Sequence, residues 1–484
     1  MPGGLRIAFV TSEMAPYAKT GGLADVAAAL PKALARLGHA VTVFLPRYQS
    51  IPFPPGDLIG SVFVPVDGVH RSAAYYALTV GEGQRVVFVD HPAFYDRPHL
   101  YSVGNDDYDD NRLRFAFLAR AALEYYRSRS ERPDVFHCHD WQTGLVPVYL
   151  KALYWHDPTL GRTPSVFTIH NHAYQGNFPG ETLGVLGLPS HLGTEQALGL
   201  HGGVSYLKGG IVFSEVVTAV SPQYAREIQG AELGYGLEGA LRSRSPDLVG
   251  ILNGVDYDEW DPRVDSHIVR RYSADDLTGK AACKADLQRI FGLPLEPDLP
   301  LVGVVSRLVA QKGLDLVAGA RADLLARPLR MVVLGTGDRG VQEGFEALAA
   351  SAPDRFAAHF VYDNGLAHKI EAGCDMFLMP SRYEPCGLSQ MYSLRYGTVP
   401  VVRATGGLVD TVEPYDPVTG EGTGFMFTEA DRAGLLGALD EALAAYGHQD
   451  EWRRLIRNEM ERDFSWERSA RGYVGVYERA IAHA

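Results

Sequence analysis

Two glycine pairs stand at places where a backbone could bind an anion. Lys19-Thr20-Gly21-Gly22 opens a stretch with apolar residues at helical spacing, and Thr405-Gly406-Gly407 opens another. Glycines let a backbone approach a ligand closely, and the first turn of a helix presents free N–H groups to an anion. Neither segment has the order of a Walker A loop. The first segment fits a phosphate-binding loop and an ordinary glycine turn beside a solvated lysine equally well.

A pair of cations and a carboxylate follow later apolar runs. Arg307 and Lys312 lie five residues apart after one run, and Glu384 stands before Pro385 after another. A planar guanidinium and a compact ammonium together suit a diphosphate, and we favour this over two surface cations. The residue before a proline is biased to extended backbone. Glu384 could therefore face a cleft, or simply favour the dipole of the next helix.

Two His-x-His pairs could bind a metal. His137 and His139 end a predicted strand and share one face, since strand side chains alternate, and His170 and His172 repeat the pattern. With Asp140 they could form the metal site of a hydrolase. No carboxylate cluster accompanies them, so we favour histidines that hydrogen-bond in a polar cleft or in the core. The metal-dependent hydrolase is the alternative from another functional class.

A literal G-x-G-x-x-G runs from Gly335 to Gly340 after a predicted strand. Taken alone, it indicates dinucleotide binding. It lies deep in the chain, however, and no convincing acidic residue ends a strand about 20 positions later, so a nicotinamide enzyme is not expected. A loop that packs against a nucleotide or phosphate and a plain strand-to-helix turn both stay possible.

Apolar runs that alternate with amphipathic stretches predict the elements that position these motifs. Continuous apolar strands between helices are typical of parallel sheets covered on both faces. In such sheets ligands bind at the carboxyl ends of the strands, where these motifs lie. The predicted strands are 5–10, 41–45, 135–138, 165–169, 216–220, 248–252, 301–305, 330–334, 360–362, 376–379 and 399–402, and the predicted helices include 22–37, 313–326 and 341–349.

The pattern restarts near residue 300, which predicts two doubly wound α/β domains. Residues 253–280 are rich in Asp and lack periodicity, so the boundary is expected there. We place the domains at residues 1–255 and 256–462. The tail, 463–484, reads as a helix with Ser465 as its N-cap. This helix either closes the second domain or crosses back to the first.

Composition excludes several classes of protein. The 484 residues carry a formal net charge of −13, which argues against a nucleic-acid or anionic-membrane partner but not against an anionic small ligand. No apolar run approaches the ~20 residues that span a bilayer, and no signal peptide is evident. The four cysteines form no C-x-x-C pair. We expect a cytoplasmic protein.

Taken together, the motifs resemble the bacterial glycogen synthase and plant starch synthase family. Their number, order and spacing over nearly the whole chain make the resemblance specific. The matching segments are K-T-G-G-L-A-D-V at 19–26, H-D-W at 139–141, T-I-H-N at 168–171, L-K-G-G-I at 207–211, L-N-G-V-D at 252–256, S-R-L-x-x-Q-K-G at 306–313, S-R-Y-E-P-C-G-L at 381–388, L-R-Y-G at 394–397, R-A-T-G-G-L-x-D-T-V at 403–412 and F-S-W at 464–466.

The resemblance implies a GT-B fold, in which two Rossmann-like domains face a deep cleft. Members transfer glucose from ADP-glucose to the non-reducing end of an α-1,4-glucan with retention at the anomeric carbon, and need no metal or other cofactor. Arg307 and Lys312 match the cations that neutralise the leaving diphosphate. Lys19, with the amides of Gly21 and Gly22, matches a loop that reaches the donor.

The resemblance assigns three further residues to the sugar. His170 is expected near the anomeric carbon, Asp140 on the glucose or acceptor side, and Glu384 at the glucose hydroxyls. Whether Glu384 also acts as a nucleophile, or the acceptor attacks from the front face, stays open. The other assigned positions are Asp25, Asn253, Tyr362, Cys386, Gly387, Leu388, Thr405, Gly406 and Gly407 for the donor, and Tyr95 for the acceptor or glucose.

The sequence departs from the wider pattern at two positions. Many retaining GT-B enzymes carry a second Glu eight positions after the first, where this chain has Tyr392, so ribose recognition must differ. Gln142 follows the H-D-W motif where close bacterial members often have His. Other retaining GT-B enzymes, including UDP-glucose users and sucrose synthase-like or trehalose-forming ones, and a non-catalytic glucan-binding protein remain as alternatives. The K-T-G-G-L and E-P-C-G-L segments argue against the sucrose- and trehalose-type enzymes.

Overall fold

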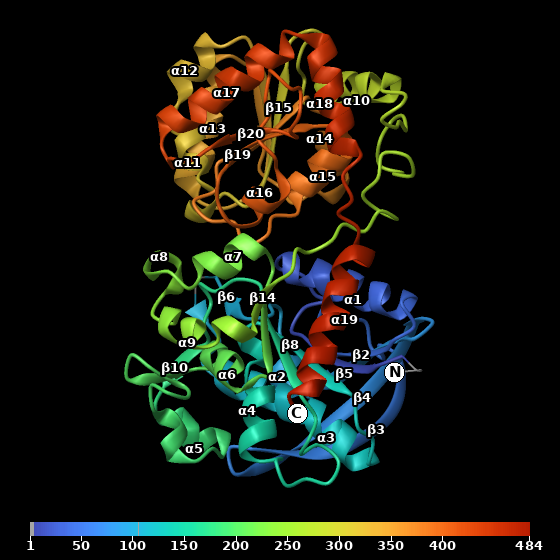
Figure 1. Ribbon diagram of the computed structural model, residues 1–484, viewed down its shortest axis with the longest axis vertical. Helices are drawn as coiled ribbons and strands as arrows, with labels where there is room; N and C mark the ends of the chain where they lie inside the picture. Colours follow the sequence, from blue (N-terminus) through green and yellow to red (C-terminus); the bar gives the residue numbers. More distant parts are fainter. Residues whose placement is uncertain (1–3, 105) are drawn as a thin grey trace. The chain divides into compact units, whose positions relative to one another are not determined.

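The chain folds into two compact units (Figure 1). The structure, a computed structural model, describes residues 4–104 and 106–484. Unit 1 comprises the described residues up to Gly254 together with Trp466–Ala484, and unit 2 comprises Val255–Ser465. The chain therefore leaves unit 1 after Gly254 and returns to it with its last helix.

Unit 1 is built on a mixed sheet with the order β14-β13-β9-β8-β1-β2-β5-β4-β3. The strands from β14 to β5 pair in parallel, and β4 and β3 add an antiparallel edge. The strands are β1 Arg6–Val10, β2 Ala40–Pro46, β3 Asp57–Val66, β4 Val69–Gly81, β5 Gln84–Asp90, β8 Val135–His139, β9 Ser165–Ile169, β13 Val216–Ala219 and β14 Leu248–Gly250.

The central strands of unit 1 are buried on both faces, as their continuous apolar sequences require. All residues of β8 and β9 are buried. The main helices are α1 Gly22–Arg36, α3 Asn111–Arg129 and α19 Trp466–Ala482, and α19 packs against α1, β8 and β9. The tail helix thus belongs to unit 1, the second of the two places that the sequence allowed.

Smaller elements complete unit 1. They are α2 Pro92–Tyr95, β6 Ser102–Val103, β7 Asp106–Asp107, η1 Trp141–Thr143, α4 Leu145–Ala152, β10 Asn177–Pro179, α5 Thr182–Leu186, η2 Ser190–Gly193, β11 Gly199–Leu200, β12 Gly203–Ser205, α6 Tyr206–Phe213, α7 Pro222–Glu227, α8 Ala231–Gly234, α9 Glu238–Ser243 and η3 Ser245–Asp247. No helix of residues 4–104 and 106–484 is long and apolar enough to cross a membrane.

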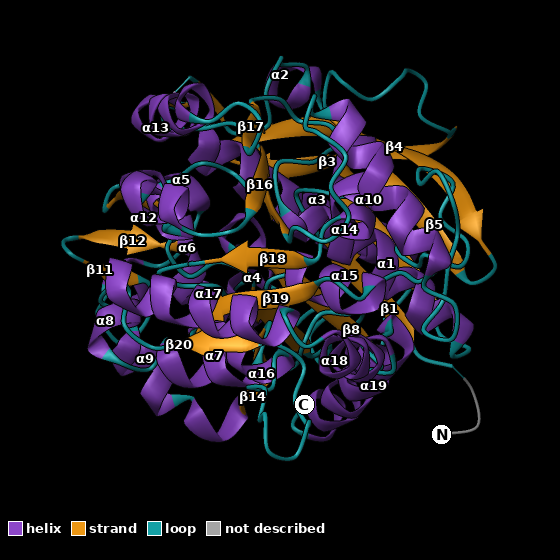
Figure 2. Cartoon of the chain, turned by 90° about the horizontal axis from the view of Figure 1, so that it is seen from above, coloured by secondary structure: helices purple, strands orange, loops and turns teal. Residues whose placement is uncertain are grey.

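Unit 2 is built on a parallel sheet with the order β17-β16-β15-β18-β19-β20. Helices such as α14 and α17 flank these strands (Figure 2). The elements are α10 Thr278–Ile290, β15 Leu301–Val305, η4 Ala310–Lys312, α11 Leu314–Gly319, α12 Arg321–Ala326, β16 Arg330–Leu334, α13 Arg339–Ser351, β17 Phe356–His359, α14 Asn364–Gly373, β18 Met376–Met379, α15 Ser389–Tyr396, β19 Val399–Arg403, α16 Gly406–Thr411, β20 Phe425–Phe427, α17 Arg432–Tyr446 and α18 Gln449–Met460.

Some predicted elements are wrong in detail. The strand predicted at 360–362 lies at Phe356–His359, because that segment pairs with β16, whereas Val361 and Tyr362 are exposed. The helix predicted at 313–326 is two helices, interrupted at Ala320. The sequence analysis also missed β3, β4 and β5. Strands β3 and β4 have one partly exposed face, unlike the buried central strands, whereas β5 is largely buried and its apolar run 86–89 was overlooked.

Candidate active site

The predicted site residues of unit 1 follow three adjacent strands. The loop with Lys19 follows β1, Asp140 follows β8 and His170 follows β9. These strands are parallel neighbours, so their carboxyl ends meet at one edge of the sheet. The structure therefore brings the three segments to the edge where an open α/β sheet binds its ligands.

Glu13, which the sequence analysis missed, holds the Lys19–Gly22 loop. Its carboxylate accepts hydrogen bonds from the N–H of Thr20 at 2.6 Å, the hydroxyl of Thr20 at 2.6 Å, the N–H of Gly21 at 3.2 Å and the hydroxyl of Tyr101 at 2.8 Å. Only 4% of Glu13 is exposed. The N–H of Gly21, expected to reach the donor, is thus bound to a carboxylate in this structure. A charged residue three positions after the buried strand β1 was the available signal.

We expect Glu13→Gln to loosen this loop. A neutral amide cannot replace the carboxylate toward all of these donors, so buried N–H or O–H groups lose partners. The free energy of unfolding should fall by about 1–3 kcal/mol, the usual result of leaving one buried polar group unsatisfied. Urea unfolding, with the exposed Glu82→Gln as control, measures this. Equal stability of the two variants would contradict the role of Glu13.

Lys19 and Asp25 form an ion pair at the start of α1. The ammonium Nζ lies 2.6 Å from Oδ1 of Asp25, and both side chains are about one third exposed. Such exposed pairs contribute little to stability, so the pair can open to a ligand at small cost.

Asp140 orients the segment that carries His170. Its Oδ1 accepts the N–H of His170 at 2.7 Å, and its backbone has a φ of +55°, a conformation uncommon outside glycine. Burial raises the pKa of Asp140 to about 7, although the backbone N–H donors favour the charged form. Strain and a shifted pKa concentrate at functional sites.

Three of the four imidazoles of the His-x-His segments, those of His137, His139 and His170, form a buried cluster. His139 Nδ1 lies 2.9 Å from His170 Nε2, and the rings of His137 and His139 are 4.0 Å apart between centroids, which confirms their shared face. Burial lowers the pKa of His170 to about 3 and those of His137 and His139 well below the ordinary value. All three are neutral near pH 7. Among the described residues, no group of three or more His, Cys, Asp or Glu could hold a metal ion.

In unit 2, the structure joins two predicted residues that are distant in sequence. Lys312 Nζ lies 2.6 Å from Oε2 of Glu384, and the hydroxyl of Ser381 donates to the same oxygen at 2.9 Å. Glu384 is 5% exposed. Arg307, by contrast, is exposed, and its guanidinium forms no hydrogen bond or ion pair with the residues that the structure describes. The loop after β15 thus carries the exposed Arg307 five residues before Lys312, which pairs with Glu384 on the loop after β18.

The glycine pair at 406–407 packs against the Glu384 segment. Gly406 has a φ of +46°, and a Cβ there would lie 1.9 Å from the carbonyl oxygen of Glu384. A Cβ on Gly407 would lie 2.0 Å from the carbonyl oxygen of Cys386, and the N–H of Gly407 donates to Glu384 O at 3.0 Å. Close backbone approach accounts for both glycines, so phosphate binding by this pair stays a prediction.

The G-x-G-x-x-G loop has a similar role. Gly335 and Gly337 have φ values of +154° and +156°, and a Cβ on either would collide with the backbone of Ser306 or Leu308. The N–H of Leu308 donates to Thr336 O at 2.8 Å. The loop therefore supports the turn that presents Arg307.

The chain is similar to known proteins over nearly its whole length. Residues 6–243 match the family model described as starch synthase catalytic domain, and residues 288–459 match that of glycosyl transferases group 1. A glycogen synthase of Koribacter versatilis is 51% identical over 98% of each chain. One from Anaeromyxobacter sp. is 49% identical over 99% of this chain and 100% of its own. The chain belongs to the glycogen and starch synthase family.

Two solved structures are similar to this chain over nearly its whole length. The catalytic domain of starch synthase IV from Arabidopsis thaliana, bound to ADP and acarbose, matches with a TM-score of 0.90 and 38% identity, over 99% of this chain and 100% of that one. A sucrose-phosphate synthase of Thermosynechococcus elongatus shares the fold, with a TM-score of 0.63 at 18% identity. The predicted class, an α/β protein of GT-B fold with two Rossmann-like domains, is confirmed.

The remaining predicted positions of this synthase-family chain differ in their surroundings. Tyr95 is fully buried, and its hydroxyl donates to Arg114 O at 2.7 Å, so it presents no surface to a ligand in this structure. Asn253 is buried, and its Oδ1 has no partner in the described part of the chain. Tyr362 is 77% exposed beyond β17. Near Glu384 lie the buried Cys386 and Thr405, Gly387 with a φ of +73°, and the half-buried Leu388.

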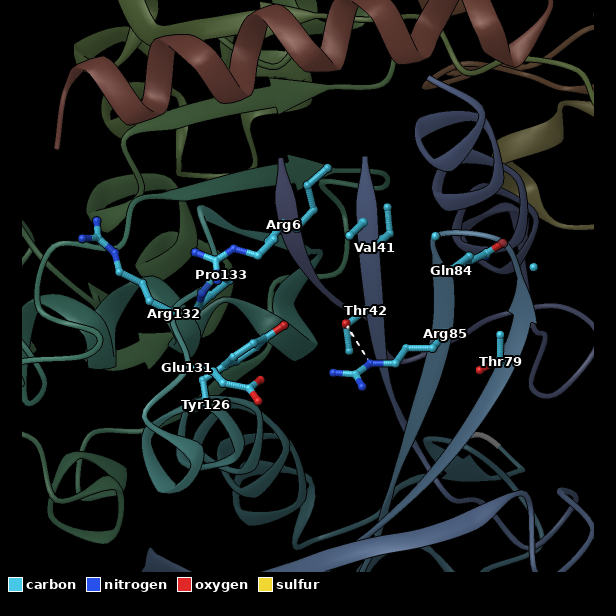
Figure 3. A pocket seen from close by; sticks show the side chains of 14 residues that line it. Arg6, Val41, Thr42, Thr79, Gln84, Arg85, Tyr126, Glu131, Arg132 and Pro133 are labelled. Atoms are coloured by element: carbon cyan, nitrogen blue, oxygen red, sulfur yellow. Dashed lines mark hydrogen bonds between the residues drawn. The ribbon is translucent and has the colours of Figure 1, made fainter. Parts of the chain in front are cut away.

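A pocket of about 360 Å³ in unit 1 lies away from these residues. Figure 3 shows Arg6, Val41 and Gln84 on its wall, together with Arg85, whose Nε donates to Thr42 Oγ1 at 3.2 Å. Arg6, Val41 and Gln84 stand at the starts of β1, β2 and β5. The pocket thus opens at the amino-terminal edge of the sheet, opposite the edge that carries Asp140 and His170.

Proposed function

We propose that this glucosyltransferase moves glucose from ADP-glucose to the non-reducing end of an α-1,4-glucan, retains the anomeric configuration and releases ADP. The observation that carries the proposal is the unpaired Arg307 beside the Lys312–Glu384 pair, on loops after parallel strands. Relatives named glycogen synthase, and the starch synthase bound to ADP and acarbose, support it. The four cysteines of this chain are buried and form no disulfide, which is consistent with a cytoplasmic protein.

The two cations stabilise the leaving diphosphate. As the bond between the anomeric carbon and the phosphate breaks, negative charge grows on the departing oxygens. Arg307 has no competing partner among the described residues and can bind two phosphate oxygens through its planar fork. Lys312 adds a point charge whose position Glu384 fixes at 2.6 Å. Donors fixed before the reaction need no reorganisation when the charge appears.

Glu384 binds the donor glucose. Its Oε2 already accepts hydrogen bonds from Lys312 and Ser381, so this oxygen is engaged by the protein before the sugar binds. This supports a role in holding sugar hydroxyls over one as a nucleophile. The acceptor then attacks from the face on which the diphosphate leaves, and the diphosphate takes the acceptor's proton.

His170 and Asp140 act on the sugar from unit 1. With its pKa lowered to about 3, His170 is neutral and contributes a hydrogen bond rather than a charge. Asp140 holds the backbone of His170, and its carboxyl group titrates near neutral pH. Lys19 can exchange Asp25 for an anionic donor, because their pair is partly exposed.

One assay tests this function directly. We expect transfer of labelled glucose to glycogen from ADP-glucose, a slower transfer from UDP-glucose, and an α-linked product. Activity should persist in EDTA, since Arg307 and Lys312 supply the positive charge. Hydrolysis of a substrate with loss of activity in EDTA would favour the metal-dependent alternative, and glucan binding without transfer would favour a binding protein.

A further inference from the structure

A fully buried histidine contacts the histidine assigned to the sugar. His139 ends β8, has no exposed surface, and places Nδ1 at 2.9 Å from Nε2 of His170. His139 has no exposed surface for a substrate, and His170 is the sugar-assigned residue that its ring contacts.

The contact between the two rings requires one donor and one acceptor. Both imidazoles are neutral near pH 7, because burial disfavours their charged forms. A neutral imidazole carries a single proton, on Nδ1 or on Nε2. Either His139 donates from Nδ1 and His170 accepts at Nε2, or His170 donates from Nε2 and His139 accepts at Nδ1.

The surroundings of His139 Nε2 distinguish the two arrangements. This atom is buried and has no hydrogen-bond partner among the described residues. The centroids of the Phe9 and His137 rings each lie 4.0 Å from the centroid of the His139 ring. In the first arrangement Nε2 is a bare acceptor, and in the second it is a buried N–H without an acceptor. Orphaned buried N–H groups are rarer in native structures than under-satisfied acceptors, which favours the first arrangement.

Donation by His139 fixes the proton of His170. If Nε2 of His170 accepts, its proton must be on Nδ1, which has no partner among the described residues. His170 keeps 9% exposure, and Asp140 holds its backbone N–H at 2.7 Å. We propose that His139 is a positioning residue that keeps His170 as the Nδ1–H tautomer, so that its free edge offers a donor to an oxygen of the sugar.

The sugar part of this inference rests on the proposed function, whereas the tautomer does not. The neighbouring His137 provides a contrast, because both of its nitrogens have other partners. Its Nδ1 lies 2.8 Å from the hydroxyl of Tyr477 and its Nε2 lies 2.7 Å from Oγ1 of Thr168. Tyr477→Phe therefore disturbs the same buried cluster without changing the contact to His170.

Nuclear magnetic resonance of the full chain, with ¹⁵N-labelled histidine, measures the tautomer. His170→Gln assigns the His170 signals by their loss. We expect the long-range ¹H–¹⁵N coupling pattern of a neutral ring protonated at Nδ1. The pattern of a ring protonated at Nε2 in the wild type would overturn the proposal, whatever the activity.

Kinetics with three variants tests the consequence. His139→Asn keeps an N–H close to the position of Nδ1, whereas His139→Leu removes it. We expect kcat to fall about 10- to 100-fold in His139→Leu, as when a partner that orients a functional histidine is lost. The kcat of His139→Asn and that of Tyr477→Phe should stay within about threefold of the wild-type value, because the activation barrier changes little.

The outcomes separate a positioning role from a structural one. Equal kcat in His139→Leu and the wild type, or an equal loss in Tyr477→Phe, would overturn the proposal. If His139→Leu does not fold, the nuclear magnetic resonance measurement of the His170 tautomer in the wild type tests the proposal by itself. A wild type that transfers no glucose from either nucleotide-sugar would contradict the proposed function, while the tautomer measurement would still stand or fall by itself.

Discussion

Lys312→Ala is expected to lower kcat for glucosyl transfer from ADP-glucose by about 100- to 1000-fold, the loss typical of removing one preorganised group that stabilises transition-state charge. Lys312 is five residues from Arg307 and is held by Glu384 at 2.6 Å. Without it, Arg307 faces the leaving diphosphate alone. The effect should fall on kcat more than on KM, because the charge grows as the bond breaks.

The controls for Lys312 separate chemistry from folding. Lys369→Ala removes another lysine of unit 2 that pairs with a carboxylate, Asp286 at 3.9 Å, and should leave kcat unchanged. Lys312→Arg keeps the charge and should recover part of the activity. Steady-state kinetics and thermal unfolding of each variant provide the comparison. A folded Lys312→Ala enzyme with wild-type kcat would remove Lys312 from the phosphate site.

Glu384→Gln is expected to lower kcat/KM by about 100-fold or more, since it removes a charge-assisted partner of the sugar and leaves Lys312 without its counter-ion. Gly406 and Gly407 contact the backbone carbonyl of Glu384, so the substitution retains these contacts. Asp315→Asn is the matched control, because Asp315 is a carboxylate of unit 2 that pairs with Arg382 instead. Kinetics with both substrates measures the effect.

Glu384→Ala with added azide tests the chemical role of this carboxylate. If Glu384 were a nucleophile, azide could take its place, attack the anomeric carbon as ADP leaves, and give a glucosyl azide of inverted configuration. If Glu384 only binds the glucose, no such product should form. Mass spectrometry of the reaction mixture detects it. Recovery of that azide would contradict the binding role that we infer from Ser381 and Lys312.

Some features of the fold were predictable because their signals are local. Continuous apolar runs located β9, β15, β16 and β18 at their observed bounds. The strand β17 was misplaced by a few residues, because the local sequence allows the strand to begin at more than one position along this apolar segment. Pairing of Phe356 with Met331 selects one of them.

The sequence by itself determined which motifs this protein carries, their order along the chain, and hence its family and its two-domain α/β class. Residue type and spacing are properties of the chain, and a parallel α/β architecture places such motifs at strand ends. The tertiary structure alone decided which groups meet. Lys312 and Glu384 are 72 positions apart, and His139 and His170 are 31 apart. It also decided that Tyr95 is buried and that Glu13 binds the glycine loop. Such contacts depend on packing between distant segments, for which the local sequence carries no signal.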